Sequence, residues 1–170
     1  LCGMAVFALA SSQGRTPVTT LLLAGVAVSG VASALTSFVL SLSLSEWELG
    51  REMLSWLMGT LEGKGWRELF LALPLIVVGV GGMFVYARDL DVLATGEESA
   101  LSVGVDVERV KRNVLLFAAL TTAATVAVIG VVGFVGLMVP HIVRLWIGPG
   151  HRRLLLGSTV TGAVFVEAAD

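Results

Sequence analysis

Long apolar runs limit what this chain can fold into more than any other feature of its sequence. They cover residues 18–44, 69–86, 113–132 and 134–147. Only 14% of the residues are charged and the mean hydropathy is +0.92, whereas about a quarter of the residues of a soluble domain are charged. Apolar runs of about 20 residues are typical of helices that cross a bilayer. The sequence therefore predicts an all-α protein, a polytopic membrane helix bundle.

The two ends of the sequence are also apolar. Residues 1–10 read as the end of one membrane helix, and residues 154–170 as the start of another. With them the chain has about five membrane segments, which we expect to form a single transmembrane domain over residues 1–170. Because both ends lie inside apolar runs, we expect this sequence to be part of a longer protein.

Lysine and arginine residues predict the orientation in the membrane. When alternate connections are assigned to opposite sides, one side carries eight of these cations and the other carries three. The eight are Arg15, Arg88, Arg109, Lys111, Arg112, Arg144, Arg152 and Arg153, and the three are Arg51, Lys64 and Arg67. Cytoplasmic loops are enriched in such residues, so the first side is predicted to be cytoplasmic. The chain shows no basic face or stripe, so we expect no nucleic-acid partner.

Residues 133–144 place polar and helix-breaking residues inside an apolar region. Gly133 and Gly136 are spaced to share one helix face, where small residues allow another backbone to come close. Pro140 removes a helical hydrogen bond. Segment 134–147 covers only about 21 Å as a helix, against a hydrocarbon core of about 30 Å. We expect it to be packed inside protein, tilted little, or continued by irregular backbone.

Two side chains near the end of that segment, His141 and Arg144, fall on one face at the cytoplasmic side. One interpretation is a kinked, packed helix with a basic anchor. The other is that both residues hold this end in register with a moving loop or a partner. His141 has no second ligand at a suitable spacing, so we predict no metal site.

The connection at residues 88–112 is predicted to contain a short helix at 96–103. Thr95 and Glu98 have the spacing of a capping box, and Gly104 is placed to end the helix. Asp106 is placed to cap the next helix. A helix this short is unstable alone in water, so it needs a surface to dock on. It is either a solvated loop helix or a coupling helix that docks on a cytoplasmic ATPase.

Four motifs, in order along the chain, resemble those of one family. The first is residues 22–27 (Leu-Leu-Ala-Gly-Val-Ala), and the second is residues 56–61 (Trp-Leu-Met-Gly-Thr-Leu) followed by Gly63 and Trp66. The third consists of Ala94, Gly96, Glu97, Ala100 and Gly104, and the fourth of Gly133, Phe134, Gly136, Leu137, Pro140, His141 and Arg144. Thr95 and Val103 depart from the third pattern. The order and spacing resemble those of FecCD-type permease subunits, which belong to binding-protein-dependent ABC importers for iron chelates, haem and cobalamin. Family members are of the ten-helix type and about twice as long.

The resemblance implies a mechanism and a set of partners. A second permease subunit, identical or related, completes the translocation path, two cytoplasmic ATPase subunits dock on the connections, and an extracytoplasmic substrate-binding protein delivers the chelate. ATP and magnesium belong to the ATPase, so this chain binds no cofactor and is not an enzyme. It has no phosphate-binding loop of its own. The resemblance also implies the prokaryotic cytoplasmic (inner) membrane and a multi-pass topology within the lipid bilayer.

Residue roles follow from the same resemblance. Contact with the ATPase is predicted for Gly96, Glu97, Glu98, Ala100 and Gly104. Position along segment 18–44 makes Thr19 and Thr20, at its cytoplasmic start, candidates for a gate. Gly25 and Ser29 belong to a face of small residues that either packs at a helix crossing or lines the translocation path. No residue is predicted to be catalytic. The motifs do not distinguish haem, ferric siderophore and cobalamin as the substrate.

Glu167 departs from the apolar residue that the family pattern has at its position. It faces the path, bonds to a helix or is protonated, and the sequence leaves these three open. A rival function is therefore a proton-coupled secondary transporter that uses Glu167 and Asp170. A third is a membrane scaffold that does not transport.

Overall fold

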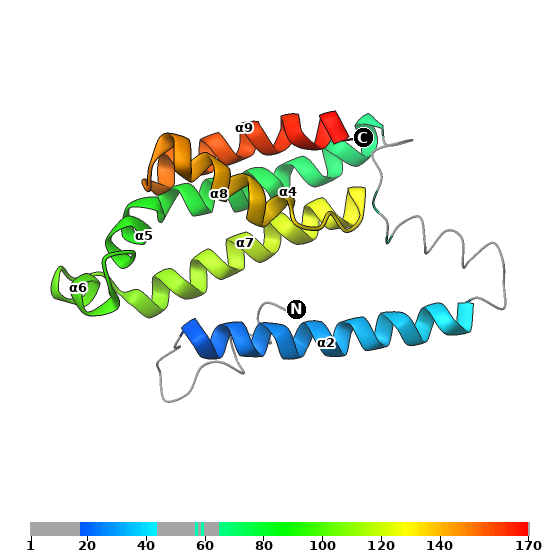
Figure 1. The fold of residues 1–170 in the computed structure, drawn as a ribbon, viewed down its shortest axis with the longest axis horizontal. Coiled ribbons are helices and arrows are strands. Elements are labelled where there is room, and N and C mark those ends of the chain that lie inside the picture. The colour runs from blue at the N-terminus through cyan, green and yellow to red at the C-terminus, as the bar shows by residue number, and fades with distance from the viewer. Residues whose placement is uncertain (1–17, 44–56, 58, 60–64, 170) are drawn as a thin grey trace. The chain divides into compact units, whose positions relative to one another are not determined.

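A computed structural model describes residues 18–43, 57, 59 and 65–169. The helices in these residues are α2 (Val18–Ser43), α4 (Trp66–Val85), α5 (Ala87–Leu93), α6 (Glu97–Ser102), α7 (Val107–Ile129), α8 (Val135–Ile147) and α9 (His151–Ala169), as Figure 1 shows. Backbone contacts divide the chain into two units, Leu1–Met58 and Gly59–Asp170. Each unit is described by itself. The predicted segment 1–10 and Asp170 lie outside the described residues.

Helix α2 is the described part of the first unit. It has 26 residues, which is about 39 Å of helix and more than the hydrocarbon core of a bilayer requires. Thr20, Ala24, Gly25 and Val28 are half-buried and recur at helical spacing, whereas most of the other side chains are exposed. One face of α2 is thus partly covered, and large apolar side chains occupy the rest of its surface.

Helices α4 and α7 form the main packed pair of the second unit (Figure 1). They approach closely because α4 carries glycines on the face toward α7. A Cβ atom added to Gly82 would lie 2.5 Å from the ring of Phe117, and one added to Gly79 would lie 2.9 Å from the carbonyl oxygen of Phe117. Small residues at a helix crossing allow such contact between backbones in membrane proteins. The sequence motifs did not single out these two glycines.

Tyr86 separates α4 from the connection that follows. Its backbone leaves the helical region (φ −87°, ψ 3°), and α5 begins at the next residue. Its hydroxyl oxygen accepts a hydrogen bond of 2.6 Å from Asn113 Nδ2 of α7, and its ring lies 6.3 Å from that of Phe117. The sequence indicated a long charged connection here and did not predict α5. Two contacts with α7 therefore fix the point where the chain changes direction.

Helices α8 and α9 form a second packed pair. Val139 and Val143 of α8 and Leu154 of α9 make a small buried core. Gly157 of α9 allows close contact, because a Cβ atom there would lie 2.7 Å from Val143 Cγ1. The sequence predicts that the last membrane segment starts at residue 154, but α9 already begins at His151, which shortens the turn between α8 and α9. The turn is shorter because backbone hydrogen bonding of α9 already starts with Leu154 N–H to Gly150 O.

The prediction that residues 134–147 form a short segment is confirmed. Helix α8 has 13 residues, or about 20 Å. It follows a non-helical stretch at 130–134 in which Gly130 has φ 80° and Phe134 has φ 62°. The segment is thus continued by irregular backbone, which was one of the three expected solutions. Gly133 lies in this stretch and outside α8, so the prediction that Gly133 and Gly136 share a helix face is wrong.

Three of the described helices are long and apolar enough to cross a membrane, namely Thr19–Ser43, Trp66–Val85 and Val107–Ile129. Val135–Ile147 is apolar but shorter. Every element in the described residues is a helix, and the predicted all-α membrane bundle is confirmed.

Candidate coupling site

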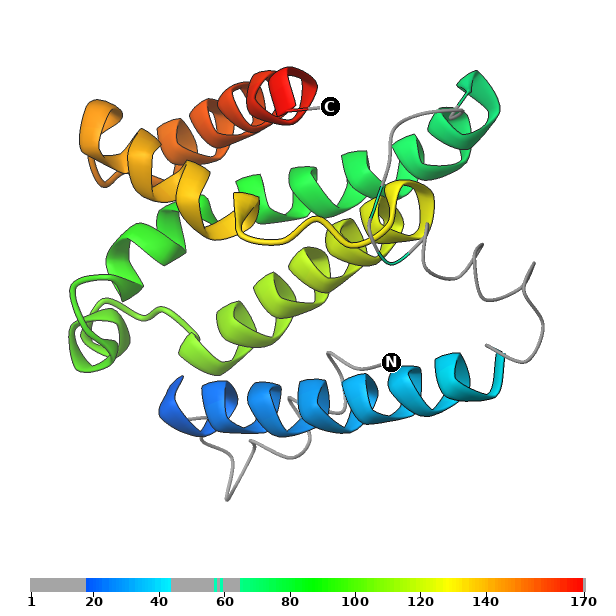
Figure 2. The same cartoon turned by 45° about the vertical axis from the view of Figure 1, so that its right-hand side comes forward.

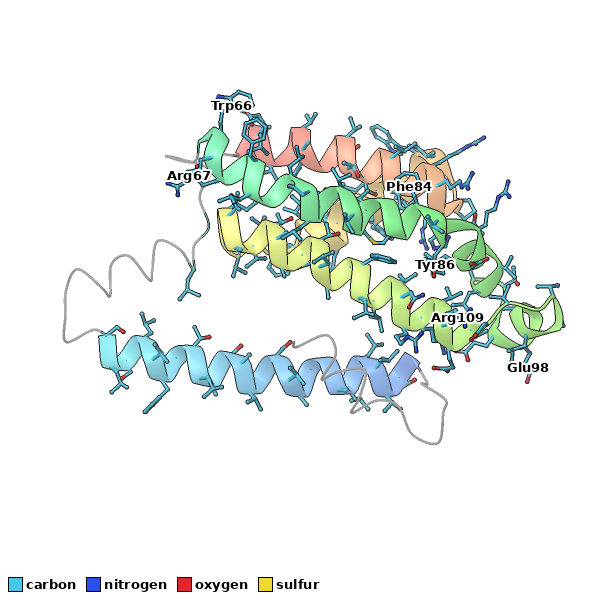
Figure 3. All side chains as sticks on the ribbon, turned by 180° about the vertical axis from the view of Figure 1, so that it is seen from behind. Trp66, Arg67, Phe84, Tyr86, Glu98 and Arg109 are labelled. Atoms are coloured by element: carbon cyan, nitrogen blue, oxygen red, sulfur yellow. The ribbon has the colours of Figure 1, made fainter. Side chains whose placement is uncertain are left out.

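One end of the second unit gathers α5, α6 and the first turns of α7 and α9 (Figure 2). Figure 3 shows Tyr86, Glu98 and Arg109 at this end and Trp66 and Arg67 at the other. Seven of the eight cations predicted to be cytoplasmic belong to the elements gathered here or to the last turn of α8: Arg88, Arg109, Lys111, Arg112, Arg144, Arg152 and Arg153. The eighth, Arg15, lies outside the described residues. We name this end the coupling end.

The start of α6 differs from the sequence prediction. Gly96, with φ 125°, is its N-cap, and no side chain caps the helix. Thr95 Oγ1 instead donates to Val92 O at 2.7 Å, which belongs to the end of α5. The predicted capping box of Thr95 and Glu98 is therefore wrong. The reason is local: α5 ends so close to α6 that the Thr95 hydroxyl satisfies a carbonyl of the preceding helix.

The end of α6 agrees with the prediction for Gly104. This residue has φ 84°, a conformation that favours glycine. Its N–H donates to Leu101 O at 3.0 Å, and Val105 N–H donates to Ala100 O at 3.0 Å. This pair of bonds is the Schellman motif, which satisfies carbonyl groups at a helix end.

The predicted cap of the next helix is also confirmed. Asp106 Oδ1 accepts a hydrogen bond of 3.1 Å from the backbone N–H of Arg109, at the start of α7. The second carboxylate oxygen lies 3.6 Å from Arg109 Nε. The side chains of both residues are mostly exposed, so we attribute the structural role of Asp106 to the cap.

An ion pair holds α6 against α7. Lys111 Nζ lies 2.7 Å from Glu97 Oε1 and 3.8 Å from Glu108 Oε1. The Lys111 side chain is only 7% exposed, whereas that of Glu97 is 49% exposed. A buried ammonium requires an anionic partner, because removal from water disfavours the charge. Glu97 is thus occupied by a contact within the chain.

The surface of α6 that faces away from the chain is acidic and apolar. Glu98 is exposed and makes no hydrogen bond or ion pair within the described residues. Leu101 is 58% exposed and Val103 is 67% exposed. Ala100 has no exposed surface, so in this structure it packs α6 against its neighbours and does not touch the outside. We call Glu98, Leu101 and Val103 the α6 outer surface.

A second charged contact joins α5 to α9. Asp91 Oδ1 accepts a hydrogen bond of 2.8 Å from the backbone N–H of His151 and lies 2.6 Å from His151 Nδ1. The backbone hydrogen bond, followed by the ring hydrogen bond, lowers the pKa of Asp91 below its usual value. Neither residue was singled out in the sequence. They lie 60 positions apart, and no local pattern connects them.

The motif residues Gly133, Gly136, His141 and Arg144 make few contacts in this structure. Cβ atoms added to Gly133 or Gly136 would meet nothing within 4 Å. His141 and Arg144 are exposed, and their side chains make no hydrogen bond or ion pair within the described part of the chain. Pro140 is half-buried within α8. The structure does place Arg144 in the last turn of α8, close in sequence to the turn that leads to α9.

The predicted path residues all lie on α2. Thr19 is exposed and Thr20 is half-buried in its first turn, with half-buried Gly25 and exposed Ser29 further along. A Cβ atom at Gly25 would meet nothing within 4 Å. These four residues belong to the first unit, and the coupling end belongs to the second. Their role in a path stays a prediction.

Glu167 lies at the opposite end of the second unit. It lines a cavity of about 500 Å³ between α4, α7 and α9, together with Trp66, Glu68 and Thr125. The walls are mostly apolar, and Glu167 itself is exposed. Within the described ranges no group of three or more His, Cys, Asp and Glu side chains could hold a metal ion.

Apolar helices of membrane length, joined by a helical connection that is fixed at the cation-rich end, define an all-α membrane protein. A model of the FecCD transport family matches residues 1–170. The chain belongs to this family.

Similar proteins agree with this assignment. The chain is 48% identical over 173 residues to the cobalamin import system permease protein BtuC of Halobacterium salinarum, covering 100% of the chain and 45% of the relative. It is 36% identical to the Fe(3+)-citrate import system permease protein YfmD of Bacillus subtilis, covering 99% of the chain and 49% of the relative. It is 38% identical to the hemin transport system permease protein HmuU of Yersinia pestis, covering 94% and 47%.

A solved structure has the same fold. It shows an inward-facing conformation of a protein described as a metal-chelate type ABC transporter, with a TM-score of 0.87 and 27% sequence identity. The match covers 96% of this chain and 51% of that chain. The chain thus spans about half the length of the proteins it matches.

Proposed function

We propose that the chain is part of the permease subunit of an ABC importer that moves an iron-siderophore, haem or cobalamin type chelate across the prokaryotic cytoplasmic membrane. Membership of the FecCD transport family supports this proposal, as do the names of the similar permeases. The structural observation that carries it is the coupling end, where a two-helix connection is fixed to α7 by the Glu97–Lys111 ion pair and to α9 by hydrogen bonds between Asp91 and His151.

The proposal includes the partners of an importer. A second permease subunit, identical or related, forms the other half of the path. Two cytoplasmic ATPase subunits bind ATP and magnesium and hydrolyse the nucleotide, and an extracytoplasmic binding protein delivers the chelate. This chain contributes helices and contacts and no catalytic group. Thr19, Thr20, Gly25 and Ser29 of α2 are the proposed path residues.

The ATPase is proposed to dock on the α6 outer surface. A partner can reach Glu98, Leu101 and Val103, which offer one carboxylate and two apolar side chains. The proposed role of four further residues is to position α6, without direct contact with the ATPase: Gly96, Glu97, Ala100 and Gly104. The two glycines set the ends of α6, Ala100 packs beneath it, and Glu97 ties it to Lys111. His141 and Arg144 of α8 are proposed to keep the cytoplasmic end of that helix in register.

Uptake by the full-length protein tests this function. The protein is reconstituted in vesicles with its ATPase and binding protein, and chelate uptake is measured with and without ATP. We expect ATP-dependent uptake. The double change Glu98→Lys and Leu101→Asp should weaken ATPase association, because it reverses a charge and places a carboxylate in an apolar contact. Glu167→Gln is the control at the opposite end and should leave association unchanged.

Two results would contradict the proposal. One is uptake driven by a proton gradient without the ATPase and abolished by Glu167→Gln, which is the behaviour of a secondary transporter. The other is ATPase association and uptake that do not change in the Glu98 and Leu101 double variant, which would reject the docking surface.

A further inference from the structure

The contact between Asp91 and His151 involves both the backbone and the ring of the histidine. One oxygen, Asp91 Oδ1, receives both the backbone N–H of His151 at 2.8 Å and the ring contact with Nδ1 at 2.6 Å. His151 is the first residue of α9. The carboxylate of one helix therefore binds the backbone at the start of another.

Helix α9 has no cap of its own at this point. Gly150 O accepts the first backbone bond of the helix, from Leu154 N–H at 3.0 Å, which places Gly150 at the N-cap position. A glycine has no side chain to accept the free N–H groups of the first turn. Asp91 supplies that acceptor from α5, and its negative charge is favourable at a helix N-terminus. The positive charge of Arg152 also lowers the pKa of Asp91, by less than the hydrogen bonds from His151 do.

The contact links two groups of helices. Asp91 belongs to α5, which leads directly into α6 with its outer surface. His151 begins α9, which shares the buried core of Val139, Val143 and Leu154 with α8. Two further side-chain bonds at the coupling end, between Lys111 and Glu97 and between Asn113 and Tyr86, lead to α7. Within the described residues, Asp91 and His151 form the side-chain bond from the connection to α9.

We propose that Asp91 is a positioning residue that caps α9 from α5 and transmits movement of the coupling connection to the α8–α9 pair. The proposal rests on the function proposed above, since it assumes that an ATPase moves the connection. It assigns a role to two residues that carry none of the family motifs identified in the sequence. Loss of the Asp91 side chain should leave the α6 outer surface intact, but movement of the α5–α6 connection should no longer be transmitted to α9.

The test uses the full-length importer with its ATPase and binding protein in vesicles, and measures chelate transported per ATP hydrolysed. We expect Asp91→Ala to lower this ratio about fivefold, the change in an equilibrium constant that loss of one hydrogen-bonded contact between α5 and α9 produces. ATPase association should stay as in the wild type. Asp91→Asn keeps an oxygen acceptor and should retain most of the ratio. Asp89→Ala, on the same helix, is the matched control and should have no effect.

A second variant separates capping from transmission. Gly150 does not have a positive φ, and a Cβ atom there would meet nothing within 4 Å, so Gly150→Asp can be accommodated and supplies a local cap. In the Asp91→Ala background it should restore slow hydrogen exchange at the amides of the first turn of α9. It should not restore the transport ratio, because the bond to α5 is still missing.

The outcomes distinguish this inference from the proposed function. If Gly150→Asp restores the transport ratio of Asp91→Ala, Asp91 acts only as a cap and the inference is rejected. It is also rejected if Asp91→Ala transports as well per ATP as the wild type. Absence of ATP-dependent uptake by the wild type would instead reject the proposed function on which the inference depends.

Discussion

Lys111 of α7 and Glu97 of α6 form an ion pair, with 2.7 Å between Nζ and Oε1. The lysine is nearly buried and the carboxylate is half exposed. Water can therefore reach the carboxylate of Glu97 but hardly reaches the ammonium group of Lys111. This asymmetry indicates that the contact fixes the position of α6 on the membrane helix that carries Lys111.

Glu97→Gln should destabilise the protein by about 1 kcal/mol, because a buried ammonium loses a charged partner while Glu108 remains nearby. The exposure of Glu97 and solvent screening limit the effect. Thermal unfolding in detergent measures it. Glu98→Gln, one residue along and without a partner among the described residues, should change the unfolding temperature little. Equal effects of the two changes would show that the ion pair does not hold α6.

The glycines of α4 allow a direct comparison of close contact with open space. Gly79→Ala should destabilise the protein by about 1–3 kcal/mol, because the new Cβ atom would overlap Thr121 and crowd the carbonyl oxygen of Phe117. Gly81→Ala is the matched control on the same helix, where a Cβ atom meets nothing within 4 Å. There the higher helix propensity of alanine should raise stability by up to about 1 kcal/mol. A loss of stability at Gly81 as large as at Gly79 would reject the proposed packing of α4 on α7.

Asp106→Ala removes the cap of α7 and should cost about 1 kcal/mol. Asp106→Ser keeps an oxygen acceptor at the cap and should recover most of that loss. Urea unfolding of the solubilised protein compares the two variants. If serine and alanine are equally destabilising, the carboxylate acts through its charge near Arg109 and not through the cap.

Asp91 gives a dependence of stability on pH. Hydrogen bonds from His151 lower the pKa of Asp91 in the folded chain below 3.8, its ordinary value. The carboxylate therefore stabilises the fold fully above pH 3.8, and this contribution is lost as the pH falls through the lower folded value. The stability difference between wild type and Asp91→Asn should be at its full size above pH 3.8 and should shrink as the pH falls below that value.

The control for this experiment is Asp89→Asn on the same helix, which should show a smaller difference over the same range. His151 and Arg152 face Asp91 and are present in both variants. A difference that grows as the pH falls below 3.8 would have the wrong sign and would contradict the assigned contact.

Features that depend on neighbours along the chain were predicted well. The apolar runs gave the positions of α2, α4 and α7, since a span needs only length and hydropathy. Asp106 and Gly104 were correctly assigned to helix ends, because a cap depends on residues three or four positions away. The Thr95 capping box failed because α5, a helix that the sequence analysis did not predict, offered a nearer acceptor.

The candidate site was predicted only in part. Motifs located α6 and its acidic residues, but could not tell that Glu97 faces Lys111 while Glu98 faces outward. The spacing of Gly79 and Gly82 is a signal for close helix packing that could have been used. No signal in the sequence pairs Asp91 with His151, because their meeting depends on how α5 and α9 pack.

The sequence by itself thus determined that this protein is an all-α membrane permease of its family, and it located the short α8 and the coupling connection. Hydropathy and helix caps are local properties, so residue order is sufficient to specify them. The tertiary structure alone decided which charges meet across helices, because partners 14 or 60 positions apart are brought together only by packing. The contact between Glu97 and Lys111 fixes the position of the α6 outer surface on α7, and the contact between Asp91 and His151 joins α5 to α9.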